Sequence, residues 1–428
     1  MKLLLIADND SQLLACEALC QRAELRHDEV TINVIPRDGT PQTILHRIGQ
    51  RGTVWTLHLN RLINSPRLLH FDAIGVFLTG SKLNDIRLAL ERRQRRPLLF
   101  CGFNGIVLAH FIEGVSWRLG YDLICLGGPR DQQALDQLVA NTPYARQRTV
   151  LTGLQRNGSV GAIKLRSQRA KCMVFAEQVV MPATTQERVQ MIRLLAELAE
   201  RSPDWTVLIK PRISPGDATF HDVETHISST LQRTLGVTPT NLRLDYRTLP
   251  ELLSESRLMV TLSSTAFFDA LDFGCRPMAM SDFGLQPAYG SHVFVGSGVW
   301  RSLAELSDLN QLDRDLAWPD PAWLKWMGYD AQFSPKNLLD ALHKLPIPES
   351  QPTVLGYPGS TQSSFNQLRL SAEAAIASHD WPSARELLGQ AALMRPLHRG
   401  VARRLAAVKI KVPLLRTLGL LISYRNLG

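Results

Sequence analysis

The chain has 428 residues, a length that fits two α/β domains with an added segment better than one hydrophobic core. Hydrophobic residues make up 45 % and charged residues 20 %, which excludes an intrinsically disordered chain. The formal net charge of +9 indicates an anionic partner such as a nucleotide, a phosphorylated glycan or a membrane surface. A nucleic acid is not the expected partner, because the sequence has no zinc-spaced Cys-x-x-Cys pairs, no aromatic ribonucleoprotein motif and no basic heptad helix.

Six scattered cysteines, most of them inside apolar runs, are typical of reduced thiols in the cytoplasm. The apolar run Leu3–Ala7 is shorter than the core of a signal peptide and is followed directly by acidic residues, so we expect a buried strand there. No stretch reaches the ~18 apolar residues of a membrane span. We therefore expect a cytoplasmic protein, either soluble or peripheral at the inner face of the membrane.

The first third of the chain alternates short apolar runs with amphipathic segments. Helices are expected over Ser11–Ala23 and, as a charged helix, over Asn84–Arg96. Strands are expected at Leu3–Ala7, Val30–Ile35, Ala73–Leu78, Leu98–Cys101 and Leu123–Leu126. This alternation predicts βα units around a parallel sheet, which gives a first Rossmann-like domain over residues 1–150. The polar segment 144–168 is the expected linker.

A second βα series follows and predicts another Rossmann-like domain over residues 170–345. Thr184 and Glu187 form a capping box for a helix that continues to Arg201. Strands are expected at Lys171–Ala176, Val207–Ile209, Arg257–Leu262 and Pro277–Met280.

Residues 365–428 form an expected helical extension. Its first part has the pattern of one tetratricopeptide-like repeat, and it fits equally well a helical brace against the domains. The closing run 401–425 mixes aliphatic with basic residues. It is either a helix on a membrane surface or a helix packed on the body with a solvated basic face.

The strongest chemical motif is the run of hydroxyl residues Ser263, Ser264 and Thr265 between a predicted strand and a predicted helix. Backbone N–H groups at a helix start have no partner within the helix, and with the added hydroxyls they suit a phosphate. The plain alternative is an ordinary Ser/Thr helix cap. Asp269 follows one helical turn later and is either a ligand of ribose hydroxyls or an exposed helix acid.

Two other strand ends carry candidate binding residues. Lys210 and Arg212 place positive charge where a leaving phosphate would lie, unless they form a solvated pair. Gln178 ends the first strand of the second domain and Gly153 lies near the hinge. Both are expected at the nucleotide or sugar.

The first strand of the chain ends at Asp8 and Asp10, either of which could deprotonate an acceptor hydroxyl as a general base. Alternatively, Asp10 or Ser11 caps the first helix. The sequence has no phosphate-binding P-loop, no G-x-S-x-G elbow and no G-x-G-x-x-G fingerprint. It also has no D-x-D on a strand-end loop of the kind that anchors a divalent metal; Asp8 and Asp10 have this spacing, but at the N-terminal strand they suit the acceptor side better. We therefore expect neither a metal nor a cofactor.

With these motifs in place, the chain resembles bacterial GT-B sialyltransferases and Kdo transferases of capsule and lipopolysaccharide synthesis. Lys210-Pro211-Arg212 stands where those enzymes carry K-x-H-P or K-P-H, and Ser263-Ser264-Thr265 matches their Ser-Ser/Thr motif. Over residues 1–325, the order I-A-D-N-D-S, F-A-E-Q, I-K-P-R, T-L-S-S-T-A, D-F-G and V-F-V-G-S-G resembles a bacterial family of glycosyltransferases more closely.

The resemblance implies a GT-B fold, in which two Rossmann-like domains face each other across a cleft. It implies transfer of a nonulosonic acid or Kdo from its CMP-activated form to a glycan or lipid-linked acceptor. Ser263 and Ser264 would bind the phosphate, and Asp8 or Asp10 would be the base. Arg212 replaces the histidine of the family motif, so a role for that histidine as proton donor does not carry over.

Three other functions remain open from the sequence: a sugar-nucleotide epimerase, a polyol-phosphate transferase, and a non-catalytic glycan-assembly subunit recruited to the membrane through the basic C-terminal helix.

Overall fold

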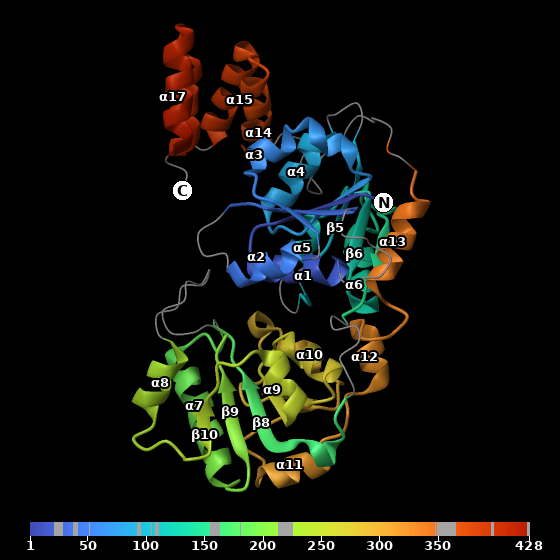
Figure 1. Ribbon diagram of the computed structural model, residues 1–428, viewed down its shortest axis with the longest axis vertical. Helices are drawn as coiled ribbons and strands as arrows, with labels where there is room; N and C mark the ends of the chain where they lie inside the picture. Colours follow the sequence, from blue (N-terminus) through green and yellow to red (C-terminus); the bar gives the residue numbers. More distant parts are fainter. Residues whose placement is uncertain are drawn as a thin grey trace.

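The computed structural model describes residues 1–20, 29–36, 42–50, 52–91, 96–103, 105–107, 111–154, 163–179, 181–212, 226–346, 348, 365–394 and 398–425. Figure 1 shows two α/β domains, one below the other, and a helical unit on the far side of the first domain. The two Rossmann-like domains and the separate C-terminal helices expected from the sequence are therefore present.

The first domain is built on a parallel seven-stranded sheet with the strand order β3-β2-β1-β4-β5-β6-β7. Its strands are β1 (Leu3–Ala7), β2 (Val30–Val34), β3 (Thr53–Trp55), β4 (Ala73–Val76), β5 (Leu98–Cys101), β6 (Leu123–Leu126) and β7 (Thr149–Leu151). The central strands are buried from end to end, as expected for a parallel sheet covered on both faces. The strand order reverses between β1 and β4, which makes this the switch point of the sheet.

Helices cover both faces of this sheet. They are α1 (Asp10–Cys20), α2 (Gln42–Gly49), α3 (Leu59–Ile63), α4 (Ser81–Glu91), α5 (Phe111–Ser116) and α6 (Pro129–Val139). A seventh helix, α13 (Pro335–Lys344), returns from the second domain and packs Leu338, Leu339 and Leu342 into the core around Leu3 and Leu5. The range 170–345 expected for the second domain thus includes a helix whose contacts lie with the first.

The second domain has a parallel six-stranded sheet with the order β10-β9-β8-β11-β12-β13, whose switch point lies between β8 and β11. Its strands are β8 (Ala170–Ala176), β9 (Thr206–Lys210), β10 (Leu242–Leu244), β11 (Ser256–Thr261), β12 (Arg276–Met280) and β13 (Trp300–Arg301). Its helices are α7 (Thr185–Glu200), α8 (Ile227–Thr234), α9 (Leu249–Glu255), α10 (Ala266–Asp272), α11 (Leu309–Asp315) and α12 (Pro321–Met327). The capping box predicted at the start of α7 is confirmed, since Glu187 N donates to Thr184 Oγ1 at 3.2 Å.

The chain crosses between the domains twice, and the two crossings touch. Leu154 N, on the outward crossing, donates to Gly328 O, on the return, at 3.1 Å. A Cβ on Gly328 would lie 2.1 Å from Gly127 O, and one on Gly128 would lie 2.4 Å from the Gly328 backbone. The absence of side chains at these glycines therefore allows three backbone segments to meet at the hinge.

The C-terminal unit contains α14 (Phe365–Ala377), α15 (Trp381–Met394), α16 (Arg399–Val408) and α17 (Pro413–Arg425). The unit has its own apolar core and meets the first domain where α14 packs on α4. Within the unit, buried Arg404 and Glu373 form an ion pair at 2.7 Å, and Tyr424 donates its hydroxyl proton to the same carboxylate. This polar cluster ties α14, α16 and α17 together.

Every strand predicted from an apolar run is confirmed, with its ends within two residues of the prediction. The four strands that were not predicted are β3, β7, β10 and β13, which are the edge strands of the two sheets. Each has two or three residues and is partly exposed, so it lacks the continuous apolar run that marks a central strand. The helix predicted over Asn84–Arg96 is α4, and residues 92–95 lie outside the described part of the chain.

Candidate functional site

A cavity lies between the domains at the carboxyl ends of β4 and β5 in the first sheet and of β11 in the second. Its volume is about 370 Å³. The first domain contributes the loops after β4 and β5 and one face of α5, and the second domain contributes the turn between β11 and α10. The lining residues are Thr79, Gly80, Phe103, Gly105, Ile106, Val107, Glu113, Gly114, Trp117, Arg118 and Thr265. Open α/β sheets bind ligands at this edge, so the interdomain cavity is the candidate active site.

On the second domain, the predicted residue Gln178 organises the switch point. Ser263 N donates to Gln178 Oε1 at 2.9 Å, and Thr261 Oγ1 lies 3.5 Å from the same oxygen. The side chain of Gln178 therefore joins the loop after β8 to the turn after β11. In this position it supports the turn that faces the cavity.

The three consecutive hydroxyl residues point in different directions. Ser263 is buried, with Oγ 3.4 Å from Met181 Sδ. Ser264 Oγ accepts a hydrogen bond at 3.2 Å from the backbone N–H of Ala266, the first residue of α10, so this hydroxyl is engaged at the start of the helix. Thr265 is the residue of this run that lines the interdomain cavity.

Asp269 lies on α10, one turn beyond Thr265, and is partly buried. Its neighbour along the helix, Asp272, accepts a hydrogen bond from Tyr329 Oη at 2.8 Å. Burial raises the pKa of Tyr329, and the negative charges of Asp272 and Asp269 raise it further. Asp269 therefore lies near Tyr329, on the segment that returns to the first domain, as well as near the turn formed by Ser263, Ser264 and Thr265.

Lys210 ends β9, and its Nζ donates to Pro211 O at 2.6 Å. Partial burial and the nearby Arg212 charge lower the pKa of Lys210, while Asp245 and Glu177 act in the opposite direction. The backbone N–H of Arg212 donates to Glu177 Oε2 at 2.9 Å, and the Arg212 side chain is exposed. The two cations predicted from the sequence thus lie together at the carboxyl edge of this sheet, next to the switch point. An approaching phosphate would favour the charged form of Lys210.

The carboxylate of Asp8 is buried at the end of β1 and forms an ion pair with Lys82, with Nζ and Oδ2 2.5 Å apart. Asn9, rather than Asp10 or Ser11, caps α1, because Asn9 Oδ1 accepts from Gln12 N at 3.0 Å. Asp10 is the first residue of α1, and its side chain lies outside the described part of the structure.

Glu113 is the acidic residue on the first-domain wall of the cavity, and it was not among the site residues predicted from the sequence. It is exposed in the first turn of α5, inside the largely apolar stretch Phe111–Ser116, where no motif distinguishes it. The adjoining loop is held by buried Arg118, which donates to Gly102 O and to Gly114 O and lies 3.8 Å from the centre of the Phe103 ring. This wall is therefore fixed in place by one buried guanidinium.

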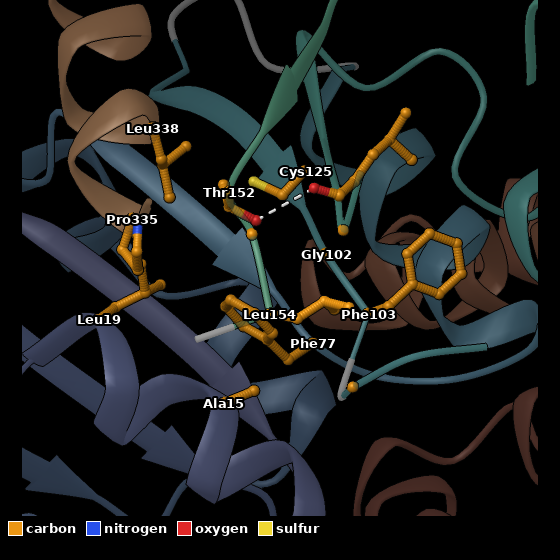
Figure 2. A pocket seen from close by; sticks show the side chains of 14 residues that line it. Ala15, Leu19, Phe77, Gly102, Phe103, Cys125, Thr152, Leu154, Pro335 and Leu338 are labelled. Carbon is orange, nitrogen blue, oxygen red and sulfur yellow. Dashed lines mark hydrogen bonds between the residues drawn. The ribbon is translucent and has the colours of Figure 1, made fainter. Parts of the chain in front are cut away.

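A smaller cavity, of about 100 Å³, lies beside the hinge between α1, α13 and the strand ends (Figure 2). Apolar side chains such as Ala15, Leu19 and Leu338 surround it, and Thr152 Oγ1 lies 3.3 Å from Leu126 O at its upper side. Drug-sized ligands occupy roughly 300–1,000 Å³, so this space is too small for a nucleotide sugar. Gly153 borders it, and a Cβ there would lie 2.3 Å from Phe333 O. The structure thus places Gly153 at the domain crossing.

Among the residues that the structure describes, no cluster of three or more His, Cys, Asp or Glu side chains is arranged to hold a metal ion. Within the same residues, no helix combines the length and the apolar character needed to cross a membrane.

Several solved structures have folds similar to that of this chain. UDP-GlcNAc 2-epimerase from Neisseria meningitidis, bound to UDP-GlcNAc, has a TM-score of 0.51 at 13 % identity, over 81 % of this chain and 100 % of that one. MnaA from S. aureus with UDP has a TM-score of 0.49 at 13 % identity, covering 80 % and 96 %. MurG from Acinetobacter baumannii has a TM-score of 0.43 at 12 % identity, covering 81 % and 100 %.

The fold shared with the first of these is the GT-B arrangement of two Rossmann-like domains, as expected from the sequence. Comparison with curated protein sequences gives no match. A protein-family model matches residues 3–345, which include both sheets and α13. The chain therefore belongs to the family described as "Putative glycosyltransferase (DUF6716)".

Proposed function

We propose that the protein transfers a glycosyl group from a nucleotide-activated donor to a hydroxyl group of a glycan or lipid-linked acceptor. The observation that carries this proposal is the interdomain cavity, which is lined by loops after β4 and β5 of the first domain and by the turn after β11 of the second. Thr265 from the second domain and Glu113 from the first line the same space. A donor held by one domain and an acceptor held by the other would therefore meet there.

The donor binds to the second domain at the switch point between β8 and β11. Thr265 offers its hydroxyl to the phosphate, while Ser263 and Ser264 shape the turn that presents it. Lys210 and Arg212 supply positive charge for the leaving phosphate. Asp269 is placed one turn further along α10, where it can accept from ribose hydroxyls, and Gln178 holds the turn.

The acceptor hydroxyl attacks the anomeric carbon of the donor. The bond between that carbon and the phosphate oxygen breaks, and the nucleotide leaves with the bonding electron pair. The acceptor proton passes to a carboxylate of the first domain, and direct displacement inverts the anomeric configuration. We assign the base to Glu113, because it lines the cavity, whereas the Asp8 carboxylate is paired with Lys82. Asp8 and Asp10 are the alternatives.

For the nucleotide we favour CMP, carrying a nonulosonic acid or Kdo. Support comes from the motifs Lys210-Pro211-Arg212 and Ser263-Ser264-Thr265, which resemble those of enzymes that use such donors. The competing choice is UDP, which is part of the sugar nucleotide bound to the Neisseria epimerase.

Nucleotide binding is tested first, through the thermal unfolding temperature with CMP, CDP, UMP, UDP and GDP. A ligand of the native state at 100 times its Kd adds about 2.7 kcal/mol. At about 2–4 °C per kcal/mol this raises Tm by roughly 5–10 °C. Thr265→Val should reduce the shift, whereas the matched control Thr185→Val, at an exposed threonine on α7, should not. If no nucleotide raises Tm, the proposal fails in favour of the non-catalytic assembly subunit.

The chemistry is tested by product analysis with the best-binding donor. Transfer yields free nucleotide and a new glycoside, whereas an epimerase yields an isomerised sugar without any acceptor. Loss of a general base lowers kcat by about 10²–10⁴-fold, which is the effect expected for Glu113→Gln. Asp8→Asn and Asp10→Asn are measured beside it. If either of these is inactive while Glu113→Gln is active, the base is the aspartate.

A further inference from the structure

The last helix of the chain, α17, exposes most of its aliphatic side chains, while Gly419, Leu420 and Ser423 face the rest of the helical unit. Five aliphatic side chains, each between 49 and 72 % exposed, lie along one face of the helix: Leu414, Leu415, Leu418, Leu421 and Ile422. The spacing of Leu414, Leu418 and Leu421 is that of one continuous helical stripe. A helix that packs on a protein body normally turns such a stripe inward.

The inward face of α17 is already occupied. Gly419 lies against Ala407 of α16, Ser423 is buried, and Tyr424 donates to Glu373 beneath the Arg404 guanidinium. Arg416 lies over the Trp381 ring at 4.3 Å and donates to Ile410 O at 2.7 Å, which fixes the turn from α16. These contacts hold the helix in its orientation, so rotation of α17 would not bury the leucines without breaking the polar cluster.

The surroundings of the apolar stripe are basic. From Leu387 to Gly428 the sequence contains no Asp or Glu and eight basic residues, Arg395, Arg399, Arg403, Arg404, Lys409, Lys411, Arg416 and Arg425. Lys409 and Lys411 are exposed in the turn that leads into the stripe, next to exposed Val412. Figure 1 shows α17 at the outer end of the helical unit, which contacts the first domain through α14.

From these observations we propose that the exposed face of α17, the residues Leu414, Leu415, Leu418, Leu421 and Ile422, binds the surface of a membrane that contains anionic lipids. The aliphatic side chains enter the boundary between headgroups and acyl chains, and Lys409 and Lys411 contact the lipid phosphates. A second copy of the chain fits less well, because residues 387–428 contain no Asp or Glu, so a contact between two copies of this face would leave Lys409 and Lys411 without an acidic partner. This proposal does not depend on the proposed function, and it concerns helices beyond the family match at residues 3–345.

The test is co-sedimentation of the full chain with vesicles of phosphatidylcholine alone and with about one third phosphatidylglycerol. The protein should bind the anionic vesicles, and binding should weaken between about 0.1 M and about 0.5 M salt. Because burial of a leucine contributes about tenfold or more in affinity, Leu414→Ser and Leu418→Ser should each weaken binding by that factor. Leu165→Ser is the matched control, since Leu165 is 68 % exposed on the second domain and should leave binding unchanged.

Lys409→Glu and Lys411→Glu should each reduce affinity for anionic vesicles at least about fivefold, with little effect on neutral ones. Circular dichroism and Tm of every variant show whether the helical unit is still folded. Equal binding to neutral and anionic vesicles, or none to either, overturns the proposal. The proposal is also overturned if sedimentation velocity shows that the wild type is a dimer and that Leu418→Ser is a monomer, because the stripe would then be an interface between two copies.

Discussion

The touching backbones at the hinge make a quantitative prediction about Gly328. This residue has φ +100°, and a Cβ would lie 2.1 Å from Gly127 O, about 1.3 Å inside the ordinary contact distance of 3.4 Å. Gly284 provides the matched control. It also has a positive φ, of +69°, but a Cβ there would meet nothing within 4 Å. The two glycines therefore separate backbone strain from the collision between crossings.

An alanine at either position carries the cost of a left-handed conformation, about 1–2 kcal/mol. Gly328→Ala adds the cost of forcing two backbone segments apart, about 1–3 kcal/mol for an overpacked site. The added cost corresponds to a further fall in Tm of roughly 2–12 °C, at about 2–4 °C per kcal/mol. Moving the crossings also displaces the two walls of the cavity, and a displacement of about 1 Å can cost about 10²-fold in rate.

Both variants are compared by differential scanning calorimetry and by nucleotide binding. Gly328→Ala should unfold at a clearly lower temperature than Gly284→Ala, and its transfer activity should fall more than its affinity for the donor nucleotide. Equal Tm values and equal activities for the two variants would show that the hinge tolerates a side chain. In that case the close backbone contact between Gly127, Gly128 and Gly328 would not hold the two crossings in place.

Three further predictions concern charged groups. Burial raises the pKa of Asp85, which is 3 % exposed, to about 7. The free energy of unfolding of the wild type should therefore fall as pH rises from about 4 to about 7. Above pH 7, Asp85→Asn should be more stable than the wild type by up to about 4 kcal/mol. Near pH 4 the two proteins should have the same Tm. Burial acts to raise the pKa of Asp313, but the hydrogen bond and charges of the surrounding arginines outweigh it and lower the pKa below 3.8. Asp313→Asn should thus cost about 3 kcal/mol at pH 7, measured by urea unfolding, and the difference should shrink as the pH falls below 3.8. Glu373→Gln leaves Arg404 buried without its ion pair and should destabilise the helical unit by about 3–5 kcal/mol in hydrogen exchange, whereas the exposed control Glu386→Gln should have no effect.

Part of the candidate site could be predicted from local sequence. The strand before Ser263 is marked by the apolar run Leu258–Val260, and the carboxyl ends of parallel strands share one edge, so Thr265 was expected near the ligand. Lys210 was expected at the same edge for the same reason. The ion pair of Asp8 could not be predicted in this way, because its partner Lys82 lies 74 residues away in the sequence. Glu113 became a candidate only once the cavity lining was known.

The sequence by itself determined which segments become strands and helices, since periodicity and capping are local properties. Central strands, the capping box of α7 and the division into two βα series all follow from residues close together in the chain. Tertiary structure decided what each segment faces. It placed α13 on the first domain, turned the leucines of α17 outward and brought Gly128 against Gly328. Each of these depends on contacts between segments far apart in sequence, and such contacts leave no local pattern to be read in advance.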